Sequence, residues 1–362
     1  MNSSALVRKL VSPEKRALQA YQVPSRQGMV KLDAMENPYL WPNSLIPEWQ
    51  ARLAYVEMNR YPDPKADGIK SLLRSVLPLS REHCLLLGNG SDELIQLLLL
   101  AVGGEKRVVM TPSPSFSMYE HLCTVIGLEF VSVDLEPTFR LNTSAFLDAI
   151  ERYNPALIFL AYPNNPTGNL FDTTSMEQII EAAPGLVVVD EAYWDFAGKS
   201  LINRIVDYPN LVVLRTLSKV GFAGLRLGYM VASEPWISEF EKFRLPYNIN
   251  VLTQASVEFA LAHYDVFRCQ IRKILDARES LAQGLVTLSD IEMFASDTNF
   301  ILVRVPIGRA TEVFEGLVEH GILVKKFDGT HVTLRDCLRV TVGTHEQNAS
   351  LLRSLQNVIS NL

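Results

Sequence analysis

Short apolar runs alternate with longer amphipathic stretches through the middle of the chain, from about Gly68 to Ala262. Several runs are continuous, as expected of strands that are buried on both faces of a mostly parallel sheet. The stretches between them are long enough for crossover helices. The pattern therefore predicts an α/β fold with a large doubly wound sheet, whose strands we place at Cys84–Leu87, Arg107–Met110, Glu129–Val133, Ala156–Ala161, Leu186–Val189 and Leu211–Leu214.

The pattern changes on either side of this central region. The first sixty residues are rich in Pro, Asn and Trp, and they predict an irregular arm that is helical only around Ser12 to Ala20. A long helical stretch, Val251 to Leu288, leads into a smaller α+β layer. Its predicted strands and helices are Asn299–Val305, Ala310–His320, Cys337–Val342 and Thr344 to Leu362. We therefore divide the chain into an arm (1–60), a large domain (61–262) and a small domain (263–362).

Composition and charge exclude several classes of protein. Of the 362 residues, 48% are hydrophobic and 20% charged, which is typical of a globular chain. The net charge of -6 gives no basic footprint for nucleic acid. The sequence has neither a signal peptide nor an apolar stretch long enough to span a bilayer. The cysteines and histidines are scattered, so we expect reduced thiols, a cytoplasmic protein and no metal site.

Four of the predicted strands are followed by segments that carry candidate chemistry. GNGSDE (88–93) permits a tight turn into a helix whose exposed N–H groups suit a phosphate, although Asp92 and Glu93 would repel one unless they point away. YPNNPTG (162–168) is a rigid turn that could present its asparagine amides to a ligand. Taken alone, either segment is typical of an ordinary structural turn.

The other two segments add charged groups. VVVDEAY (187–193) places Asp190 at the end of a buried strand, where a carboxylate must be paired, either with a cationic ring nitrogen or as a helix cap. TLSKVGFAGLR (216–226) carries Lys219, which could form an imine, beside groups that could hold a phosphate. Ligands of doubly wound sheets bind beyond the carboxyl ends of the strands. Together, the four segments predict one ligand site that combines a phosphate cradle, a polar loop, a buried acid and a lysine with an arginine, although none of them predicts it alone.

With these motifs in order, the sequence resembles the fold-type I (class II) pyridoxal-phosphate-dependent aminotransferases, and among them the histidinol-phosphate aminotransferases. NNPTG, VVVDEAY and TLSK followed by GLRLG carry the resemblance to the fold and the cofactor. The narrower resemblance depends on AYQVPS (20–25), KLDAMENPY (31–39), RYPDP (60–64), PSFSMY (114–119) and CLRVTVGT (337–344). It implies pyridoxal 5'-phosphate as the cofactor and a homodimer in which the N-terminal arm makes subunit contacts.

The resemblance also assigns roles to single residues. Lys219 would hold the cofactor as a Schiff base and then move the proton, and Asp190 would keep the pyridine nitrogen protonated. Tyr193 and Asn165 would hydrogen-bond the ring O3', and Phe116 would stack on the ring face. The cofactor phosphate would be held by Gly90, Ser91, Thr216, Ser218, Arg226 and, from the second subunit, Tyr61.

Substrate recognition is implied in the same way. Arg339 would bind the substrate anion, because a guanidinium can pair with the carboxylate of glutamate or the phosphate of histidinol phosphate. Asn165 would also contact the substrate, and Tyr21 would close over it. Lys325 stands where relatives often carry arginine. Among the remaining residues we expect Tyr119, Trp194 and Phe222 in the core, and Glu177, Glu181 and Asp195 in solvent.

The implied reaction is the transfer of an amino group from L-histidinol phosphate to 2-oxoglutarate, giving imidazole-acetol phosphate and L-glutamate in histidine biosynthesis by a ping-pong mechanism. Two other activities fit the same scaffold: decarboxylation of threonine phosphate and transamination of aromatic amino acids. A third alternative is a non-catalytic sensor that binds the cofactor, but the chain has no room for an additional DNA-binding domain.

Overall fold

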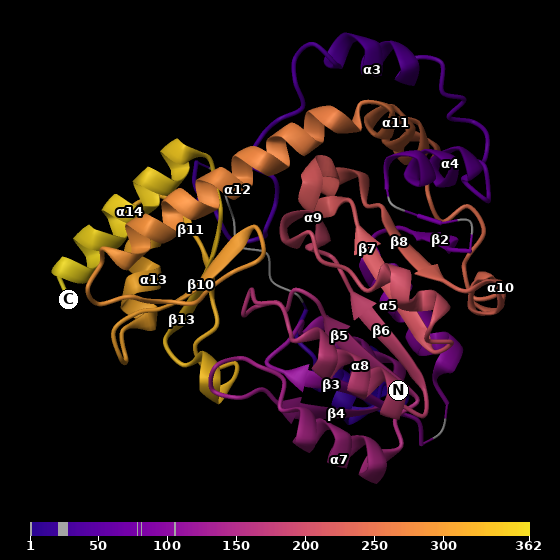
Figure 1. Cartoon of the computed structure of the whole chain (residues 1–362), viewed down its shortest axis with the longest axis horizontal. Helices are drawn as coiled ribbons and strands as arrows, with labels where there is room; N and C mark the ends of the chain where they lie inside the picture. The colour runs from indigo at the N-terminus through magenta and orange to yellow at the C-terminus, as the bar shows by residue number, and fades with distance from the viewer. Residues whose placement is uncertain (1, 21–27, 78, 81, 105) are drawn as a thin grey trace.

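The computed structural model describes residues 2–20, 28–77, 79–80, 82–104 and 106–362. Its centre is a seven-stranded sheet of order β2-β8-β7-β6-β5-β3-β4 (Figure 1). β8 is antiparallel to both neighbours, and the other adjacent pairs are parallel. The strands are β2 (Cys84–Gly88), β3 (Val108–Ser113), β4 (Glu129–Asp134), β5 (Leu157–Ala161), β6 (Leu186–Asp190), β7 (Leu211–Thr216) and β8 (Gly228–Ala232). The predicted doubly wound α/β fold is confirmed.

Helices cover both faces of this sheet, which is why its strands are apolar throughout. Along β5, Leu157 and Phe159 belong to one apolar core and Ile158 and Leu160 to the other. The first core is closed by α5 (Ser91–Val102), α6 (Met118–Ile126) and α10 (Glu234–Glu241). The second is closed by α4 (Asp67–Val76), α7 (Thr143–Tyr153), α8 (Thr173–Ala182) and α11 (Val251–Ala262).

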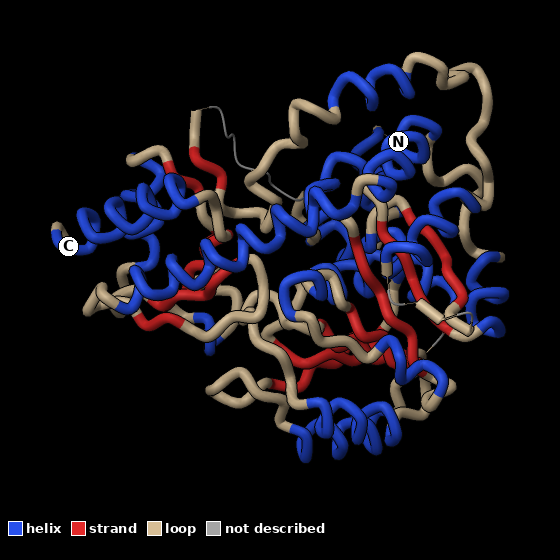
Figure 2. The backbone as a smooth tube through the Cα atoms, turned by 45° about the horizontal axis from the view of Figure 1, so that its top comes forward, coloured by secondary structure: helices blue, strands red, loops and turns tan. Residues whose placement is uncertain are grey.

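A second, smaller layer follows in the chain. Its four-stranded antiparallel sheet has the order β12-β13-β10-β9. Figure 2 shows this sheet apart from the large one, with the long helix α12 (Tyr264–Val286) running between the two. Its elements are β9 (Glu292–Met293), β10 (Phe300–Arg304), α13 (Ala310–Glu319), β12 (Lys325–Lys326), β13 (Cys337–Thr341) and α14 (His345–Ser360). α14 begins with a capping box of Thr344 and Gln347, at the residue where the sequence predicted its start.

The N-terminal segment connects the two layers. β1 (Val30–Lys31) pairs in parallel with β11 (Ile322–Leu323). The chain then passes the lysine loop of the large sheet, where the Trp41 indole donates to the carbonyl of Gly221 (3.1 Å). The predicted boundary after residue 262 coincides with the end of α11, and the three-part division of the chain stays a prediction.

One helical expectation was wrong. The arm contains α1 (Ser3–Leu10) and α3 (Ile46–Leu53) in addition to α2 (Pro13–Ala17). α1 begins at an Asn2 side-chain cap and buries none of its residues. The helical stretch predicted over Val251 to Leu288 consists of two helices, which meet at His263. Within the described residues, no helix combines the length and the apolar character needed to cross a membrane.

Candidate active site

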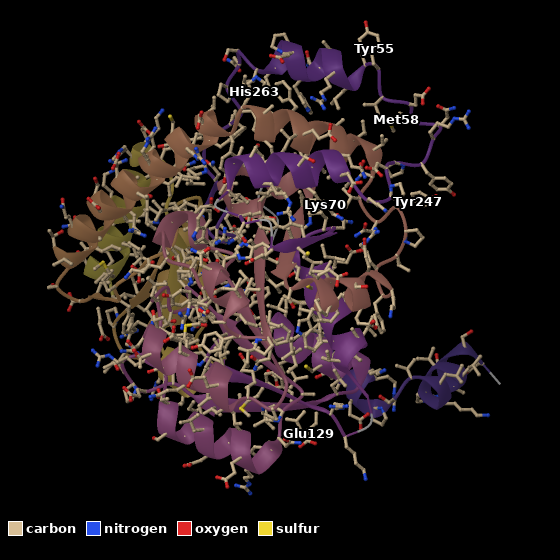
Figure 3. All side chains as sticks on the ribbon, turned by 45° about the vertical axis from the view of Figure 1, so that its right-hand side comes forward. Tyr55, Met58, Lys70, Glu129, Tyr247 and His263 are labelled. Carbon is tan, nitrogen blue, oxygen red and sulfur yellow. The ribbon has the colours of Figure 1, made fainter. Side chains whose placement is uncertain are left out.

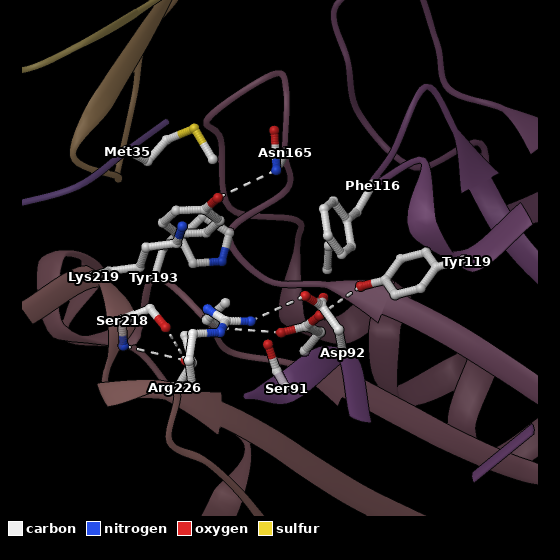
Figure 4. Close-up of a pocket in the computed structure, with 15 residues that line it drawn as sticks. Met35, Ser91, Asp92, Phe116, Tyr119, Asn165, Tyr193, Ser218, Lys219 and Arg226 are labelled. Carbon is white, nitrogen blue, oxygen red and sulfur yellow. Dashed lines mark hydrogen bonds and ion pairs between the residues drawn. The ribbon is translucent and has the colours of Figure 1, made fainter. Parts of the chain in front are cut away.

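The candidate residues converge at one edge of the large sheet. β2, β3, β5, β6 and β7 all end there, and the antiparallel β8 begins there. The loops at this edge line a pocket with an empty volume of about 590 Å³, including its open mouth (Figure 4). The pocket is lined by Ser91, Phe116, Asn165, Asp190, Tyr193, Thr216, Ser218, Lys219 and Arg226, among others.

Asp190 provides a buried carboxylate in this pocket. Its side chain is 5% exposed, and it accepts hydrogen bonds from the Tyr119 hydroxyl (2.7 Å) and the Ala192 amide (3.1 Å). Burial raises the pKa of Asp190 to about 6, and the two hydrogen bonds oppose that rise. No cationic side chain satisfies this carboxylate, within the hydrogen bonds and ion pairs described for it, so it is suited to a cationic ligand atom.

Lys219 provides the amine. It lies in the irregular helical turn η2 (Ser218–Phe222), where Gly221 adopts a φ of 125° that other residues rarely take. Its Nζ donates to the carbonyl of Ala34 (3.4 Å) and lies 5.7 Å from the centre of the Tyr193 ring. Burial, followed by the positive charge of Arg339, lowers the pKa of Lys219 to about 8. The neutral, nucleophilic amine is therefore more populated near neutral pH than in an ordinary lysine.

The two asparagines of the loop after β5 have different roles: Asn164 stabilises the loop, and Asn165 faces the pocket. Asn164 is fully buried and ties the loop together by donating to the Pro114 carbonyl (3.0 Å) and the Thr167 hydroxyl (2.8 Å). Asn165 instead faces the pocket, where its amide donates to the Tyr193 hydroxyl (3.2 Å; Figure 4). Of the two amides expected to face a ligand, only that of Asn165 does so.

A cradle for an anion forms where α5 begins. A Cβ on Gly90 would lie 2.7 Å from Nη2 of Arg226, and one on Gly228 would lie 2.5 Å from the Ser91 amide nitrogen. A side chain at Gly90 would therefore crowd the guanidinium, and one at Gly228 would crowd the backbone where α5 begins. Thr216 and Ser218 are buried beside it and hydrogen-bonded to each other (3.0 Å). A guanidinium, hydroxyls and helix N–H groups are donors that suit a phosphate.

The two acidic residues of this turn behave differently. Glu93 points away from the pocket and accepts from the Asn89 amide (2.5 Å) and the Asn248 side chain (2.7 Å). Asp92 lines the pocket, with an oxygen 3.5 Å from Nη2 of Arg226. Both members of this pair are about half exposed, so the contact is weak and leaves Arg226 able to bind another anion.

A wider cavity adjoins the first and shares Met35, Asp92, Phe116 and Asn165 with it. Arg339 lies in its wall on β13, 6% exposed, and donates to the Asp33 carbonyl (3.0 Å) and to the Asn165 side-chain oxygen. Lys325 on β12 lies opposite Arg339 on β13 in the antiparallel pair, and it lines the same cavity. The small sheet thus presents two cations toward the pocket of the large sheet.

One predicted residue lies away from the pocket. Tyr61 is 80% exposed, stacks on Tyr247 with ring centres 4.5 Å apart, and does not line the pocket of its own chain as described. Tyr21 lies outside the described residues. The structure therefore brings together every predicted site residue that it describes except Tyr61.

The sequence interpretation missed three features near the site. Tyr119 is buried as expected, but its hydroxyl contacts Asp190. Asp195 is partly buried rather than fully solvated: Tyr264 donates to it (3.0 Å), and burial raises its pKa to about 6. Glu191, the residue after Asp190, forms a buried ion pair with Arg215 (2.8 Å). The sequence Asp190-Glu191 at the end of a buried strand indicates a second buried carboxylate. No sequence pattern identified Arg215 as the residue that pairs with Glu191.

The comparisons with known proteins agree with this geometry. Residues 27–355 match the family described as aminotransferase class I and II. The chain belongs to this family. Its members work with pyridoxal 5'-phosphate, so the predicted cofactor is confirmed, and the buried acid, the lysine of lowered pKa and the anion cradle fit that group. The chain is also 49% identical, over 346 residues, to a protein of Nitrosococcus oceani named histidinol-phosphate aminotransferase 2, with 96% of each chain covered.

Solved structures support the fold. A histidinol-phosphate aminotransferase from Sinorhizobium meliloti, determined with pyridoxal 5'-phosphate, superposes with a TM-score of 0.86 at 24% identity, covering 97% of this aminotransferase and 98% of that one. An L-threonine-O-3-phosphate decarboxylase from Porphyromonas gingivalis gives 0.76 at 22% identity, with coverage of 92% and 100%. The scaffold is thus shared by enzymes of different reactions, and the fold alone does not choose between them.

Proposed function

We propose that this aminotransferase transfers the amino group of L-histidinol phosphate to 2-oxoglutarate, as a step of histidine biosynthesis in the cytoplasm. One structural observation carries the proposal: Lys219, Asp190 and the buried Arg339 are gathered around two adjoining cavities. The 49% identity to a relative named for this reaction, over nearly the whole of both chains, supports the choice of donor.

The residues of the chain divide the chemistry between them. When bound, pyridoxal 5'-phosphate supplies an electron sink for the negative charge that develops at the substrate Cα. Asp190 would hold its ring nitrogen, and Asn165 and Tyr193 form a hydrogen-bonded pair suited to the ring O3'. Lys219, with a pKa lowered to about 8, would accept and return the proton. Ser91, Thr216, Ser218 and Arg226 would hold the phosphate, and Phe116 would cover one ring face.

Arg339 is the proposed anchor for both substrates. Its guanidinium is fixed by Asp33 and Asn165, and it can pair with a carboxylate or with a phosphate ester. We expect Arg339→Lys to lower kcat/KM about 10- to 100-fold for both histidinol phosphate and 2-oxoglutarate, because a lysine keeps the charge but loses the paired donors. Affinity for the cofactor should not change.

Arg335→Lys is the matched control, because Arg335 precedes the same strand but is 73% exposed. Steady-state kinetics on both substrates and fluorescence titration of the cofactor measure the two effects. Equal, small effects of both substitutions on kcat/KM would contradict the anchoring role.

A homodimer is the second part of the proposal. Large apolar and aromatic side chains are exposed around the segment that follows α3 and the loop before α11, and Figure 3 shows Tyr55, Met58 and Tyr247 along one edge of the molecule. Tyr55 is 88%, Met58 65% and Leu245 72% exposed. Exposed patches of this kind mark interaction sites. Tyr61 belongs to this patch, so in a dimer it would face the partner's cofactor phosphate.

Complementation between inactive chains tests that assignment. Tyr61→Ala and Lys219→Ala are each expected to lose most activity. When the two variants are co-expressed, about half of the dimers are mixed, and each mixed dimer has one intact site if Tyr61 acts across the interface. We expect about a quarter of wild-type activity to return. No recovery in mixed dimers, verified with two affinity tags, would place Tyr61 in its own subunit's site or outside any site.

A substrate panel tests the reaction itself. Purified protein with cofactor is offered histidinol phosphate, threonine phosphate or phenylalanine, with and without 2-oxoglutarate, and the release of glutamate and CO2 is measured. We expect glutamate from histidinol phosphate and no CO2. Release of CO2 from threonine phosphate, or turnover of phenylalanine without turnover of histidinol phosphate, would replace the proposed reaction with the corresponding alternative.

A further inference from the structure

Tyr119 makes a contact that the roles above leave unused. It lies on α6, three residues after Phe116, and its hydroxyl donates to the Asp190 carboxylate over 2.7 Å (Figure 4). The side chain is completely buried. A buried phenol needs a partner for its hydroxyl, but the partner here is the one carboxylate that faces the pocket without a cation among its described contacts.

The ring of Tyr119 is held on two sides. Phe159 of β5 stacks on it, with ring centres 4.4 Å apart and an angle of 5° between the planes. Phe116 meets it edge to face at 5.5 Å and 87°. Phe116 in turn lines the pocket as the proposed contact for the cofactor ring. The hydroxyl of Tyr119 is therefore aimed at Asp190 by packing, and Phe116 would link this contact to the ring face of the cofactor.

The hydrogen bonds leave the carboxylate in one orientation. Oδ1 of Asp190 accepts from the Ala192 amide and Oδ2 accepts from Tyr119, so each oxygen is fixed and keeps a lone pair for the pocket. The nearby charges of Asp92 and Glu191 disfavour its ionisation, and burial does so more strongly. The hydrogen bonds from Tyr119 and the Ala192 amide lower the pKa of Asp190 and so oppose these effects. Burial and Asp190 raise the pKa of Tyr119 well above 10, so Tyr119 stays a donor.

We propose that Tyr119 is a positioning residue for the reaction: its hydroxyl keeps Asp190 ionised and correctly oriented, so that the ring nitrogen of the cofactor stays protonated during turnover. The inference rests on the proposed function for its catalytic consequence. Its structural part, the dependence of Asp190 on Tyr119, can be measured without cofactor or substrate.

Tyr119→Phe removes the hydroxyl and keeps the stacked ring. Carbon-13 NMR of the Asp190 carboxyl in the cofactor-free protein, assigned by comparison with Asp190→Asn, should show its titration midpoint at least about one pH unit higher, because a hydrogen bond to a charged group is lost. Fluorescence titration should show about tenfold weaker binding of pyridoxal 5'-phosphate. In the active enzyme, kcat should fall with little change in KM, and the acidic limb of its pH profile should move upward with Asp190.

The matched control is Tyr264→Phe. Tyr264 also donates to a partly buried aspartate, Asp195, but neither residue lines the pocket. This variant should shift the titration of Asp195 and leave Asp190, cofactor affinity and the pH profile unchanged. If Tyr119→Phe is too unstable to purify, Phe159→Leu keeps the hydroxyl but frees the ring, and it should shift the Asp190 midpoint in the same direction by a smaller amount.

The outcomes separate this inference from the proposed function. An Asp190 midpoint that is the same in wild type, Tyr119→Phe and Phe159→Leu overturns the positioning role, whatever the enzyme's substrate proves to be. A shifted midpoint with no effect on cofactor affinity, kcat or the pH profile overturns its catalytic part. A wild-type protein that binds the cofactor but transfers no amino group overturns the proposed function and leaves the NMR result standing.

Discussion

Lys219→Ala is expected to lower kcat by at least about 10⁴-fold, because it removes both the amine that attaches the cofactor and the base that moves the substrate proton. The protein should still bind pyridoxal 5'-phosphate noncovalently. The cradle of Ser91, Thr216, Ser218 and Arg226 and the carboxylate of Asp190 do not depend on the lysine.

The lowered pKa of Lys219 gives this prediction a pH dependence. The neutral amine is the reactive form, so covalent attachment of the cofactor to the apoprotein should accelerate as pH rises and level off above about 8, the pKa of Lys219. With an ordinary lysine pKa, only about 0.3% of the amine would be neutral at pH 8, whereas about half is neutral here. Stopped-flow absorbance on mixing apoprotein with cofactor measures the rate.

Lys219→Arg is the control that keeps the positive charge beside Ala34 and Tyr193 but has no usable neutral amine. It should be as inactive as the alanine variant, and borohydride should then fail to fix the cofactor to either protein. Sustained turnover in Lys219→Ala would contradict the role of the lysine, as would an attachment rate that is still rising steeply at pH 10.

Asp190→Asn is expected to lower kcat by about 10³-fold or more, because an amide cannot keep the ring nitrogen protonated and the electron sink is lost. At the same time the variant should stabilise the cofactor-free protein at neutral pH. The carboxylate is 5% exposed and costs free energy when it is ionised without a cation. Loss of activity with gain of stability distinguishes a functional acid from a structural one.

The sign of the stability effect follows from the pKa. Asp190 titrates near 6 in the folded protein and near 3.8 when unfolded, so the folded state binds the proton more tightly. Its contribution to the free energy of unfolding therefore falls as pH rises from about 4 to 6, by on the order of 2 to 3 kcal/mol. Asp190→Asn should have a higher Tm than wild type at pH 7.5, and the difference should shrink toward pH 4.

Asp297→Asn is a control with a structural aspartate. Its carboxylate accepts from the Leu170 amide (3.1 Å) and does not line the cofactor pocket. This variant should keep its activity. If Asp190→Asn lowered the Tm at pH 7.5, or retained normal kcat, the carboxylate would be a structural partner rather than a holder of the ring nitrogen.

The sequence predicted the large sheet and most of the site because both depend on local pattern. Continuous apolar runs mark strands covered on both faces, and the residues that follow them lie at one edge by the geometry of parallel strands. Asp190, Asn165, Lys219 and Arg226 could therefore be placed together before any coordinates were considered. Arg339, from a different sheet, could be assigned only through resemblance.

The remaining features depend on contacts that no local pattern reveals. The hydroxyl of Tyr119 reaches Asp190 across 71 positions, and Tyr264 reaches Asp195 across 69. Tyr119 was predicted as core from its position alone, and in both cases only the tertiary fold shows the polar partner of the tyrosine hydroxyl. The antiparallel β8 was not among the predicted strands. Its position between β2 and β7 is nonetheless what brings Arg226 to the pocket edge.

The central claim, that this chain transfers an amino group from histidinol phosphate, is tested most directly by a half-reaction. Purified protein saturated with pyridoxal 5'-phosphate is mixed with histidinol phosphate in the absence of any acceptor, and the visible absorption of the bound cofactor is followed. The proposed function predicts that one equivalent of donor abolishes the visible band and that 2-oxoglutarate then restores it. A visible band that histidinol phosphate leaves unchanged would contradict the claim, even in a protein that binds the cofactor well.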